Sequence, residues 1–192
     1  DLRDREKLEL LCQKLKETLP RLDYFFCNAG KSIHRKITDA LDRLHDYDRT
    51  IDLNYRALVA LSLALLPTLK ASKGSIVYSS SVSTRYPMAP GWSAYHASKC
   101  AANTWCETAN SEFAPLGVRV QIAYLPLVHT AMSDVNERYR QLPAYYPADA
   151  ANILLRLAIR KRKRYQPWWA KLSAPIAYLF APIVHLFYKR MV

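Results

Sequence analysis

Three short apolar runs, separated by stretches of helical length, constrain the fold of this chain more than any other feature. They are rich in aromatic and β-branched residues, as buried strands are, and they lie at residues 22–27, 74–78 and 118–124. Leucines at helical spacing predict a helix over residues 4–18 and a second helix that starts at Asp46 or Asp48 and breaks at Pro67. Strands that alternate with helices predict an α/β fold with a parallel sheet.

Two further helices continue the pattern. One of them carries Tyr95 and is stopped by Pro115 and Gly117, and the other runs from Pro147 to Ile159. A length of 192 residues suits one domain with a substantial core. The helices and strands therefore predict a single α/β unit.

The third helix carries a tyrosine and a lysine four residues apart, Tyr95 and Lys99. This spacing places both side chains on one face of the helix. A free phenol has a pKa near ~10, and a neighbouring ammonium is expected to lower that pKa by stabilising the phenolate. Tyr95 is then a candidate general acid or base, although the same pair also occurs on ordinary solvated helix faces.

Cysteine and histidine give no sign of a metal site. The four cysteines form no C-x-x-C pair, and the five histidines lack the spacing of zinc ligands. We therefore predict reduced cysteines, no metal and a cytoplasmic protein. The charged residues that open the chain are not followed by an apolar run, so no signal peptide is expected.

The net charge of +12 is concentrated in the last segment of the chain. Residues 160–192 hold eight lysines and arginines and no acidic residue, which leaves only +4 for the preceding residues. Nucleic-acid binding is therefore not expected as the main function. We predict two regions, an α/β domain over residues 1–159 and a basic, apolar extension over residues 160–192.

The extension contains an apolar run at residues 172–188, preceded by Trp168 and Trp169. Two prolines and a histidine within this run argue against a membrane span. Basic residues, tryptophans and an apolar segment together favour a segment that lies in the interface of an anionic membrane. The alternatives are an apolar arm that covers the substrate pocket and one that contacts a partner subunit, as in a homo-oligomer.

Five short motifs follow one another at characteristic places in the predicted elements. They are Asn28-Ala29-Gly30 after a strand, Asn54 in the next helix, Ser80-Ser81 after the next strand, Tyr95-x-x-x-Lys99, and Pro126-x-Val128-x-Thr130-x-Met132 after the last strand. In this order they resemble the short-chain dehydrogenases/reductases, in their single-domain branch, over residues 1–159. The resemblance implies a Rossmann-like, doubly wound parallel sheet, with NAD or NADP as the cofactor and a small-molecule carbonyl or alcohol as the substrate.

Catalytic roles follow from the resemblance residue by residue. Tyr95 would exchange a proton with the substrate oxygen, while Lys99 would lower the pKa of Tyr95 and hold the nicotinamide ribose. Ser81 would donate a hydrogen bond to the substrate oxygen. Asn54 would order a water molecule behind Lys99, although the residue pattern alone favours an Asn54 that faces solvent or bonds a neighbouring carbonyl.

Ser81 and Ser83 compete for the substrate-facing role, since they lie fourteen and twelve residues before Tyr95. We favour Ser81, because Ser-Ser-Val-Ser-Thr matches the family's Ser-Ser-x-Ala-Gly. The cofactor contacts that the resemblance implies are Asp1 near the adenine ring, Asn28, Ala29 and Gly30 in a cofactor-side turn, Tyr95 and Lys99 at the ribose, and Pro126, Val128 and Thr130 after the last strand, with Thr130 at the nicotinamide amide.

Two features depart from the family pattern. No G-x-G motif occurs, and the chain has only four glycines, so the turn that holds the cofactor pyrophosphate is missing. If Asp1 and Leu2 end a strand, the resemblance places the first strand–helix units of the Rossmann-like sheet before Asp1. Leu127 stands where the family has glycine. The residue that separates NAD from NADP would also lie before Asp1.

The remaining polar candidates lie near the end of the domain and beside Tyr95. His96 is expected to pack beside the site, because neighbouring residues on a helix diverge. His129 either contacts substrate or faces solvent. Residues 134–146 are polar and rich in Tyr and Pro, which suits a substrate lid.

The function predicted is an NAD(P)-dependent oxidoreductase that interconverts an alcohol and a ketone or aldehyde, on a lipophilic substrate. One alternative is a catalytically silent Rossmann-like binding or scaffold protein whose basic extension carries the function. Another is an isomerase or dehydratase on the same frame, which would bind the cofactor without net oxidation or reduction.

Overall fold

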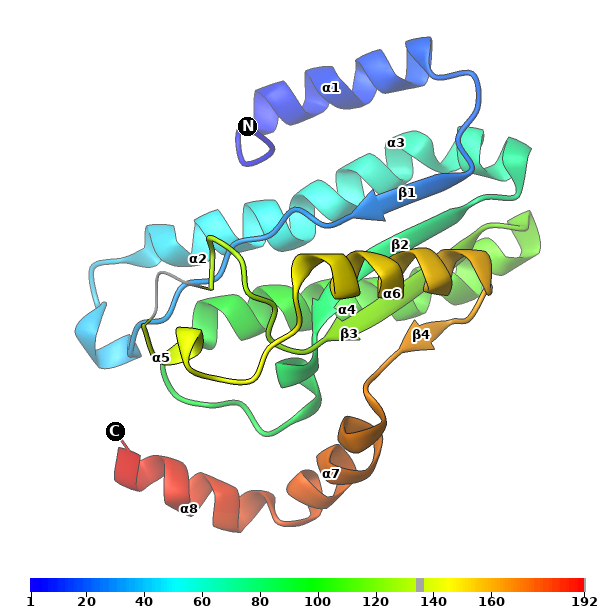
Figure 1. Cartoon of the computed structure of the whole chain (residues 1–192). Helices are drawn as coiled ribbons and strands as arrows, with labels where there is room; N and C mark the ends of the chain where they lie inside the picture. Colours follow the sequence, from blue (N-terminus) through cyan, green and yellow to red (C-terminus); the bar gives the residue numbers. More distant parts are fainter. Residues whose placement is uncertain (134–136, 192) are drawn as a thin grey trace.

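The computed structural model of this chain describes residues 1–133 and 137–191, and its centre is a parallel sheet. The sheet has four strands in the order β1-β2-β3-β4, all parallel (Figure 1). The strands are β1 (Tyr24–Cys27), β2 (Ser75–Ser81), β3 (Arg119–Leu125) and β4 (Arg164–Tyr165). The predicted α/β fold with a parallel sheet is confirmed.

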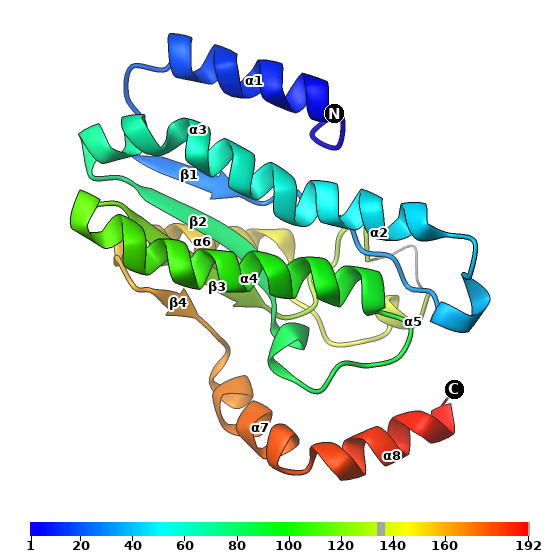
Figure 2. The same cartoon turned by 180° about the vertical axis from the view of Figure 1, so that it is seen from behind.

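Helices cover both faces of the sheet, because the strands are apolar on both faces. Helices α3 (Ala57–Ser72) and α4 (Ser93–Phe113) cover one face of the sheet (Figure 2), and Ile76 and Tyr78 of β2 pack with them. Val77 lies between them in sequence and packs against α6 (Pro147–Ile159) on the opposite face. Helix α1 (Arg5–Thr18) packs on the outer side of α3.

The shorter elements lie in the connections between these helices and strands. They are the 3-10 turns Ile37–Asp39, Val82–Arg85 and Ala114–Leu116, helices α2 (Leu44–Ile51) and α5 (Glu137–Arg140), a π-helical turn at Asp52–Arg56, and helices α7 (Trp168–Leu179) and α8 (Ala181–Met191). The π-helical turn joins α2 to α3 without a break. Turns of this kind often occur at functional sites, and this one carries Asn54.

Several predicted element limits are wrong. The helix predicted to break at Pro67 runs on to Ser72, because Pro67 lies on the exposed side of α3, where water can replace the lost hydrogen bond. The helix predicted to start at Asp46 or Asp48 begins at Leu44, and Asp46 is instead buried in ion pairs with Arg35 and Arg43.

Other differences concern the strands. Asp1 and Leu2 do not form a strand but a turn before α1. Strand β2 continues through Ser79 and Ser80 to Ser81, whereas Ser83 and Thr84 lie in the 3-10 turn that follows it. The last strand pairs Arg164 and Tyr165 with β3, so the sheet extends past residue 159 into the basic segment.

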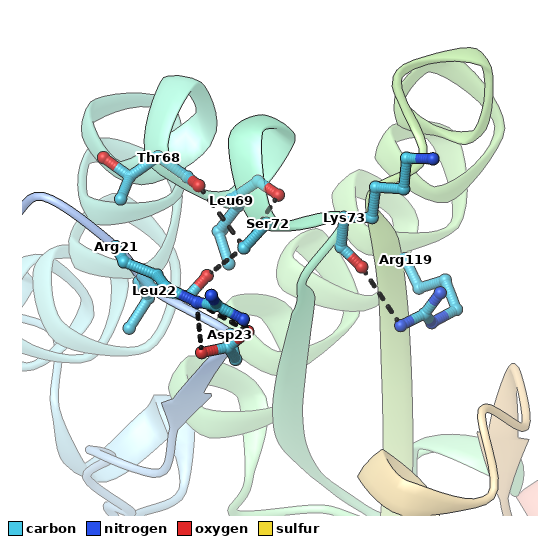
Figure 3. A network of polar contacts seen from close by, with 8 residues as sticks. All are labelled: Arg21, Leu22, Asp23, Thr68, Leu69, Ser72, Lys73 and Arg119. Carbon is cyan, nitrogen blue, oxygen red and sulfur yellow. Dashed lines mark hydrogen bonds and ion pairs between the residues drawn. The ribbon is translucent and has the colours of Figure 1, made fainter.

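A polar network fixes the amino-terminal edge of the sheet (Figure 3). The Ser72 hydroxyl donates to the Leu22 carbonyl, and Arg119 donates to the Lys73 carbonyl at 3.3 Å. A side chain at Gly74 would lie only 2.8 Å from the Asp23 carbonyl oxygen, so the turn into β2 needs glycine. This network sets the register of β1 against β2, and thereby determines which residues reach the opposite edge.

Candidate active site

A cavity of about 410 Å³ lies at the carboxyl ends of β2 and β3. This is the edge at which open α/β sheets bind ligands. The predicted site residues that line it are Asn28, Gly30, Ser81, Tyr95, Lys99, Pro126, Val128 and Thr130. Residues that lie more than a hundred positions apart in the chain are therefore brought to one place by the sheet.

Lys99 is buried at the cavity, with 6% of its surface exposed. Its ammonium donates a hydrogen bond to the Ser79 carbonyl at 2.8 Å and lies 4.8 Å from the centre of the Tyr78 ring. Burial lowers the pKa of Lys99 to about 8. Helix α4 thus carries an ammonium into the interior, where its charge acts in a poorly solvated environment.

Asn54 lies behind the cavity, in the π-helical turn, and is 1% exposed. Its side-chain amide accepts from the Lys31 backbone N–H at 2.8 Å and donates to the Lys31 carbonyl at 2.9 Å and to the Ser98 hydroxyl at 2.8 Å. Asn54 therefore does not face solvent, and its bond to the Lys31 carbonyl is one of three that it makes. Asn54 joins the segment after β1 to helix α4, directly behind Lys99.

Gly30 is packed between these two groups. A side chain there would lie 3.4 Å from the Asn54 carbonyl oxygen and 3.5 Å from the Lys99 nitrogen. A larger residue would therefore cover the ammonium on the cavity side. The glycine after β1 keeps the approach to Lys99 open.

Tyr95 lines the same cavity, and Ser81 lies beside its phenol. Burial raises the pKa of Tyr95, and the nearby Tyr139 raises it further, whereas the neighbouring Ser81 hydroxyl lowers it. Burial has the largest effect, so the pKa of Tyr95 lies above its usual value, and the lowering by Lys99 stays a prediction. At neutral pH the phenol holds its proton and is ready to donate it.

Ser81 begins a row of polar side chains, Ser81, Ser83 and His96, that the sequence did not indicate. Its hydroxyl lies 2.9 Å from the Ser83 hydroxyl, which lies 3.1 Å from His96 Nε2. Both Ser83 and His96 line the cavity. His96 is buried, its Nδ1 has no hydrogen-bond partner among the described residues, and burial lowers its pKa. The spacing along α4 indicated only that His96 diverges from Tyr95, since the turn that brings Ser83 to it is a tertiary feature.

The outer wall of the cavity is aromatic and apolar. Trp92 stacks on Tyr139 with ring centres 5.8 Å apart and meets Tyr95 edge-on at 5.9 Å. Apolar side chains from the last predicted motif and from the lid region complete the wall, namely Leu125, Leu127, Val128, Met132 and Leu142. Such a lining suits a substrate with a hydrocarbon part.

A lid is predicted for residues 134–146, and residues 134–136 of this segment lie outside the part of the chain that the structure describes. Tyr139 and Leu142 from this segment do line the cavity. His129 does not line it and instead faces the Tyr146 ring, with ring centres 6.2 Å apart.

Two predicted cofactor residues lie outside the cavity lining. Asp1 is exposed and forms an ion pair with Arg3. Ala29 lies between the lining residues Asn28 and Gly30 but is not part of the lining itself. Within residues 1–133 and 137–191, no cluster of three His, Cys, Asp or Glu side chains could hold a metal ion.

Known proteins resemble this chain in sequence and in fold. A family model described as short chain dehydrogenase matches residues 1–140. A fatty acyl-CoA reductase of Acinetobacter baylyi is 32% identical over 186 residues, which cover 96% of this chain and 62% of that protein. A fatty acyl-CoA reductase of Mycobacterium tuberculosis is 32% identical over 168 residues, covering 87% of this chain and 57% of that protein. The chain thus spans about three fifths of the length of these relatives.

Solved structures give the same fold. A short chain dehydrogenase from Burkholderia cenocepacia, in complex with NADP, superposes with a TM-score of 0.76 at 23% identity, over 100% of this chain and 76% of that one. A short-chain dehydrogenase from Streptomyces avermitilis gives a TM-score of 0.77 at 21% identity, over 97% and 76% of the two chains. The family model, the relatives and the parallel sheet agree, and the chain belongs to the short-chain dehydrogenase/reductase family.

Proposed function

We propose that this protein is an NAD(P)-dependent oxidoreductase that interconverts an alcohol and an aldehyde or ketone on a lipophilic molecule. The observation that carries the proposal is that the Tyr95 phenol, the Ser81 hydroxyl and the buried ammonium of Lys99 line one cavity. A proton donor, a hydroxyl and a fixed cation in one apolar cavity suit proton transfer to a carbonyl oxygen.

The residues around Lys99 fit the ribose side of a nicotinamide cofactor. Among the described residues, the Ser79 carbonyl is the one hydrogen-bond acceptor of the Lys99 ammonium, which leaves donors for ribose hydroxyls. Gly30 keeps the space above that ammonium free of a side chain. The glycine-rich turn that would hold the pyrophosphate is not in this sequence, so these residues would hold only the nicotinamide half. The NADP complex of the Burkholderia cenocepacia relative supports this class of cofactor.

Tyr95 donates its proton to the substrate oxygen when a carbonyl is reduced. The bound nicotinamide would supply the hydride, and the two together convert the carbonyl to an alcohol. Ser81 donates a hydrogen bond to the same oxygen and polarises it. Lys99 stabilises the phenolate that remains on Tyr95, since its charge lies at the same cavity. Asn54 holds the Lys31 backbone and Ser98 in place behind Lys99.

A long-chain aldehyde is the substrate that we favour. The apolar wall of the cavity supports a hydrocarbon chain. The relatives from Acinetobacter baylyi and Mycobacterium tuberculosis are both named fatty acyl-CoA reductases, which supports a substrate with a long hydrocarbon chain.

Carbonyl reduction is expected to fall as the pH rises through about 8. Burial lowers the pKa of Lys99 to about 8, so its charge is present below that pH and is lost above it. Tyr95 stays protonated throughout, because burial raises its pKa. A profile of kcat/KM against pH, measured with the full-length protein, checks this. A rate that keeps rising through pH 8 to 9 would contradict a catalytic charge on Lys99.

Ser81→Ala is expected to lower kcat about a hundredfold, because it removes a hydrogen-bond donor to the developing oxyanion. Ser83→Ala is the matched control, since Ser83 reaches Tyr95 only through the Ser81 hydroxyl and its loss is expected to cost less than about tenfold. Steady-state kinetics of both variants check this. The reverse order would assign the substrate-facing role to Ser83.

Cofactor titration distinguishes the proposed reaction from its alternatives. The full-length protein is expected to oxidise the reduced nicotinamide when an aldehyde is added, with loss of nicotinamide absorbance. Binding of the cofactor without turnover of any carbonyl would favour a silent binding or scaffold protein. Conversion of substrate without any change in nicotinamide absorbance would favour an isomerase or dehydratase.

A further inference from the structure

Helices α7 and α8 form an arm that projects from the sheet domain (Figure 1). We use the name α7–α8 arm for residues 168–191. Among the described residues, no single helix is long and apolar enough to cross a membrane, but α7 and α8 meet this test together across a bend of 83°. Two helices at this angle cannot both follow a membrane normal, whereas both can lie in one membrane plane.

The α7–α8 arm exposes an unusual number of large apolar side chains. Trp168, Leu172, Ile176 and Leu179 recur at helical spacing along α7 and are 56% to 75% exposed. Ile183 and Phe187 continue the apolar surface on α8, at 65% and 61% exposed. The opposite side of α7 carries the buried Ala170 and Ala174. A soluble monomer rarely exposes a continuous apolar surface of this kind.

The charge of the arm is of one sign. Lys171, Lys189 and Arg190 are exposed, and the segment from residue 160 to the end of the chain has no acidic residue. Five more exposed basic residues lie at positions 160–164, before the arm. In the part of the chain that the structure describes, none of these eight side chains takes part in an ion pair. Apolar side chains flanked by unpaired cations complement the surface of an anionic bilayer.

The arm is attached to the loop that follows Ser81. The Tyr86 hydroxyl lies 2.6 Å from the Ser173 hydroxyl, and the Tyr178 hydroxyl donates to the Tyr86 carbonyl at 3.2 Å. On α8, the Tyr188 hydroxyl donates to the Pro87 carbonyl at 3.4 Å. Ala89, two residues beyond Pro87, lines the cavity. A surface bound by the arm therefore lies next to the cavity.

We propose that the α7–α8 arm binds the surface of an anionic phospholipid membrane and presents the cavity to substrate held in that membrane. The exposed apolar side chains of the arm enter the interface, and the basic residues contact the lipid phosphates. These apolar side chains are Trp168, Leu172, Ile176, Leu179, Ile183 and Phe187. The presentation of substrate rests on the proposed function, whereas the binding of the membrane does not.

Sedimentation with vesicles tests the binding. The full-length protein is expected to sediment with vesicles that contain phosphatidylglycerol and phosphatidylcholine, and to bind vesicles of phosphatidylcholine alone more weakly. Leu172→Glu is expected to reduce the ratio of bound to free protein at least about tenfold, because a charge replaces a leucine that would enter the membrane interface. Leu10→Glu is the matched control on α1, since Leu10 and Leu172 are 65% and 66% exposed, and its binding should be unchanged.

Three results would overturn the membrane assignment. One is no sedimentation with anionic vesicles, and a second is equal loss of binding in both leucine variants. The third is self-association in the absence of lipid that Leu172→Glu abolishes, which would make the arm a contact between copies of this chain. Thermal unfolding of each variant shows whether it is folded. If Leu172→Glu does not fold, Lys189→Gln with Arg190→Gln replaces it, and weaker binding to anionic vesicles alone is then expected.

A kinetic comparison separates the inference from the proposed function. Leu172→Glu is expected to raise KM about tenfold for a long-chain aldehyde held in anionic vesicles, in line with its loss of binding, and to leave turnover of a short, water-soluble aldehyde unchanged. An unchanged KM in vesicles would overturn the presentation of substrate. Failure of the unsubstituted protein on both aldehydes would instead contradict the proposed function, and the sedimentation result would stand by itself.

Discussion

Tyr95→Phe is expected to lower carbonyl reduction at least about a hundredfold, because it removes the phenol proton that the cavity places beside Ser81. The ring remains, so its edge-on contact with Trp92 and the packing of α4 are kept. We expect the midpoint of thermal unfolding to change little. Steady-state kinetics and thermal unfolding of the full-length protein measure the two effects separately.

Tyr139→Phe is the control for this variant. Tyr139 lines the same cavity and stacks on Trp92, but it has no part in the proposed proton transfer. Removal of the Tyr139 hydroxyl should leave kcat within about threefold of the original value, since a single neutral hydrogen bond contributes little free energy. Retained turnover in Tyr95→Phe, or equal losses in the two variants, would remove Tyr95 from the mechanism.

Lys99→Met is the second change with a large expected effect, and it separates activity from stability. Turnover is expected to fall at least about a hundredfold, because the fixed charge at the cavity is lost. The free energy of unfolding at neutral pH is expected to stay equal or to rise. Lys99 is 6% exposed, and methionine fills a similar volume without a buried charge.

The direction in which the free energy of unfolding changes with pH follows from the pKa of Lys99. Burial lowers the pKa of Lys99 from 10.5 to about 8. Between these two pH values the unfolded chain binds more protons than the folded chain, so stability rises with pH in this window. Below about pH 8 both states are protonated and the full cost of burying the charge applies, on the order of 3 kcal/mol before the Ser79 hydrogen bond offsets part of it.

Urea unfolding of both proteins at neutral pH and above pH 10 checks this prediction. The difference in unfolding free energy between Lys99→Met and the original protein should be largest at neutral pH and should shrink at high pH, because only the original protein gains stability there. If the difference in unfolding free energy between the two proteins does not depend on pH, Lys99 has the same pKa in the folded and unfolded chain. Loss of stability in Lys99→Met with turnover retained would assign Lys99 a structural role.

Local patterns in the sequence were sufficient for three of the four strands and for the helices that cover the sheet, but not for the short strand β4. The apolar runs around Phe25, Val77 and Ile122 predicted the strands, because buried parallel strands need side chains that are apolar on both faces. The spacing of Tyr95 and Lys99 placed both on one face of a helix, and both line the cavity. Element limits were less predictable. At Pro67 the outcome depended on which side of α3 faces water, which the local sequence does not fix.

The sequence alone determined which chemical groups the chain can offer, namely a tyrosine and a lysine one helical turn apart, hydroxyls after a strand and a basic, apolar segment. The tertiary structure decided what these groups do to one another. It places Ser81 beside Tyr95 and joins it through Ser83 to His96, and it buries both Tyr95 and Lys99, so that desolvation raises the pKa of the phenol and lowers the pKa of the ammonium. The physical reason is that helix and strand patterns depend on neighbours along the chain, whereas burial and hydrogen-bond partners depend on segments that meet only when the sheet forms.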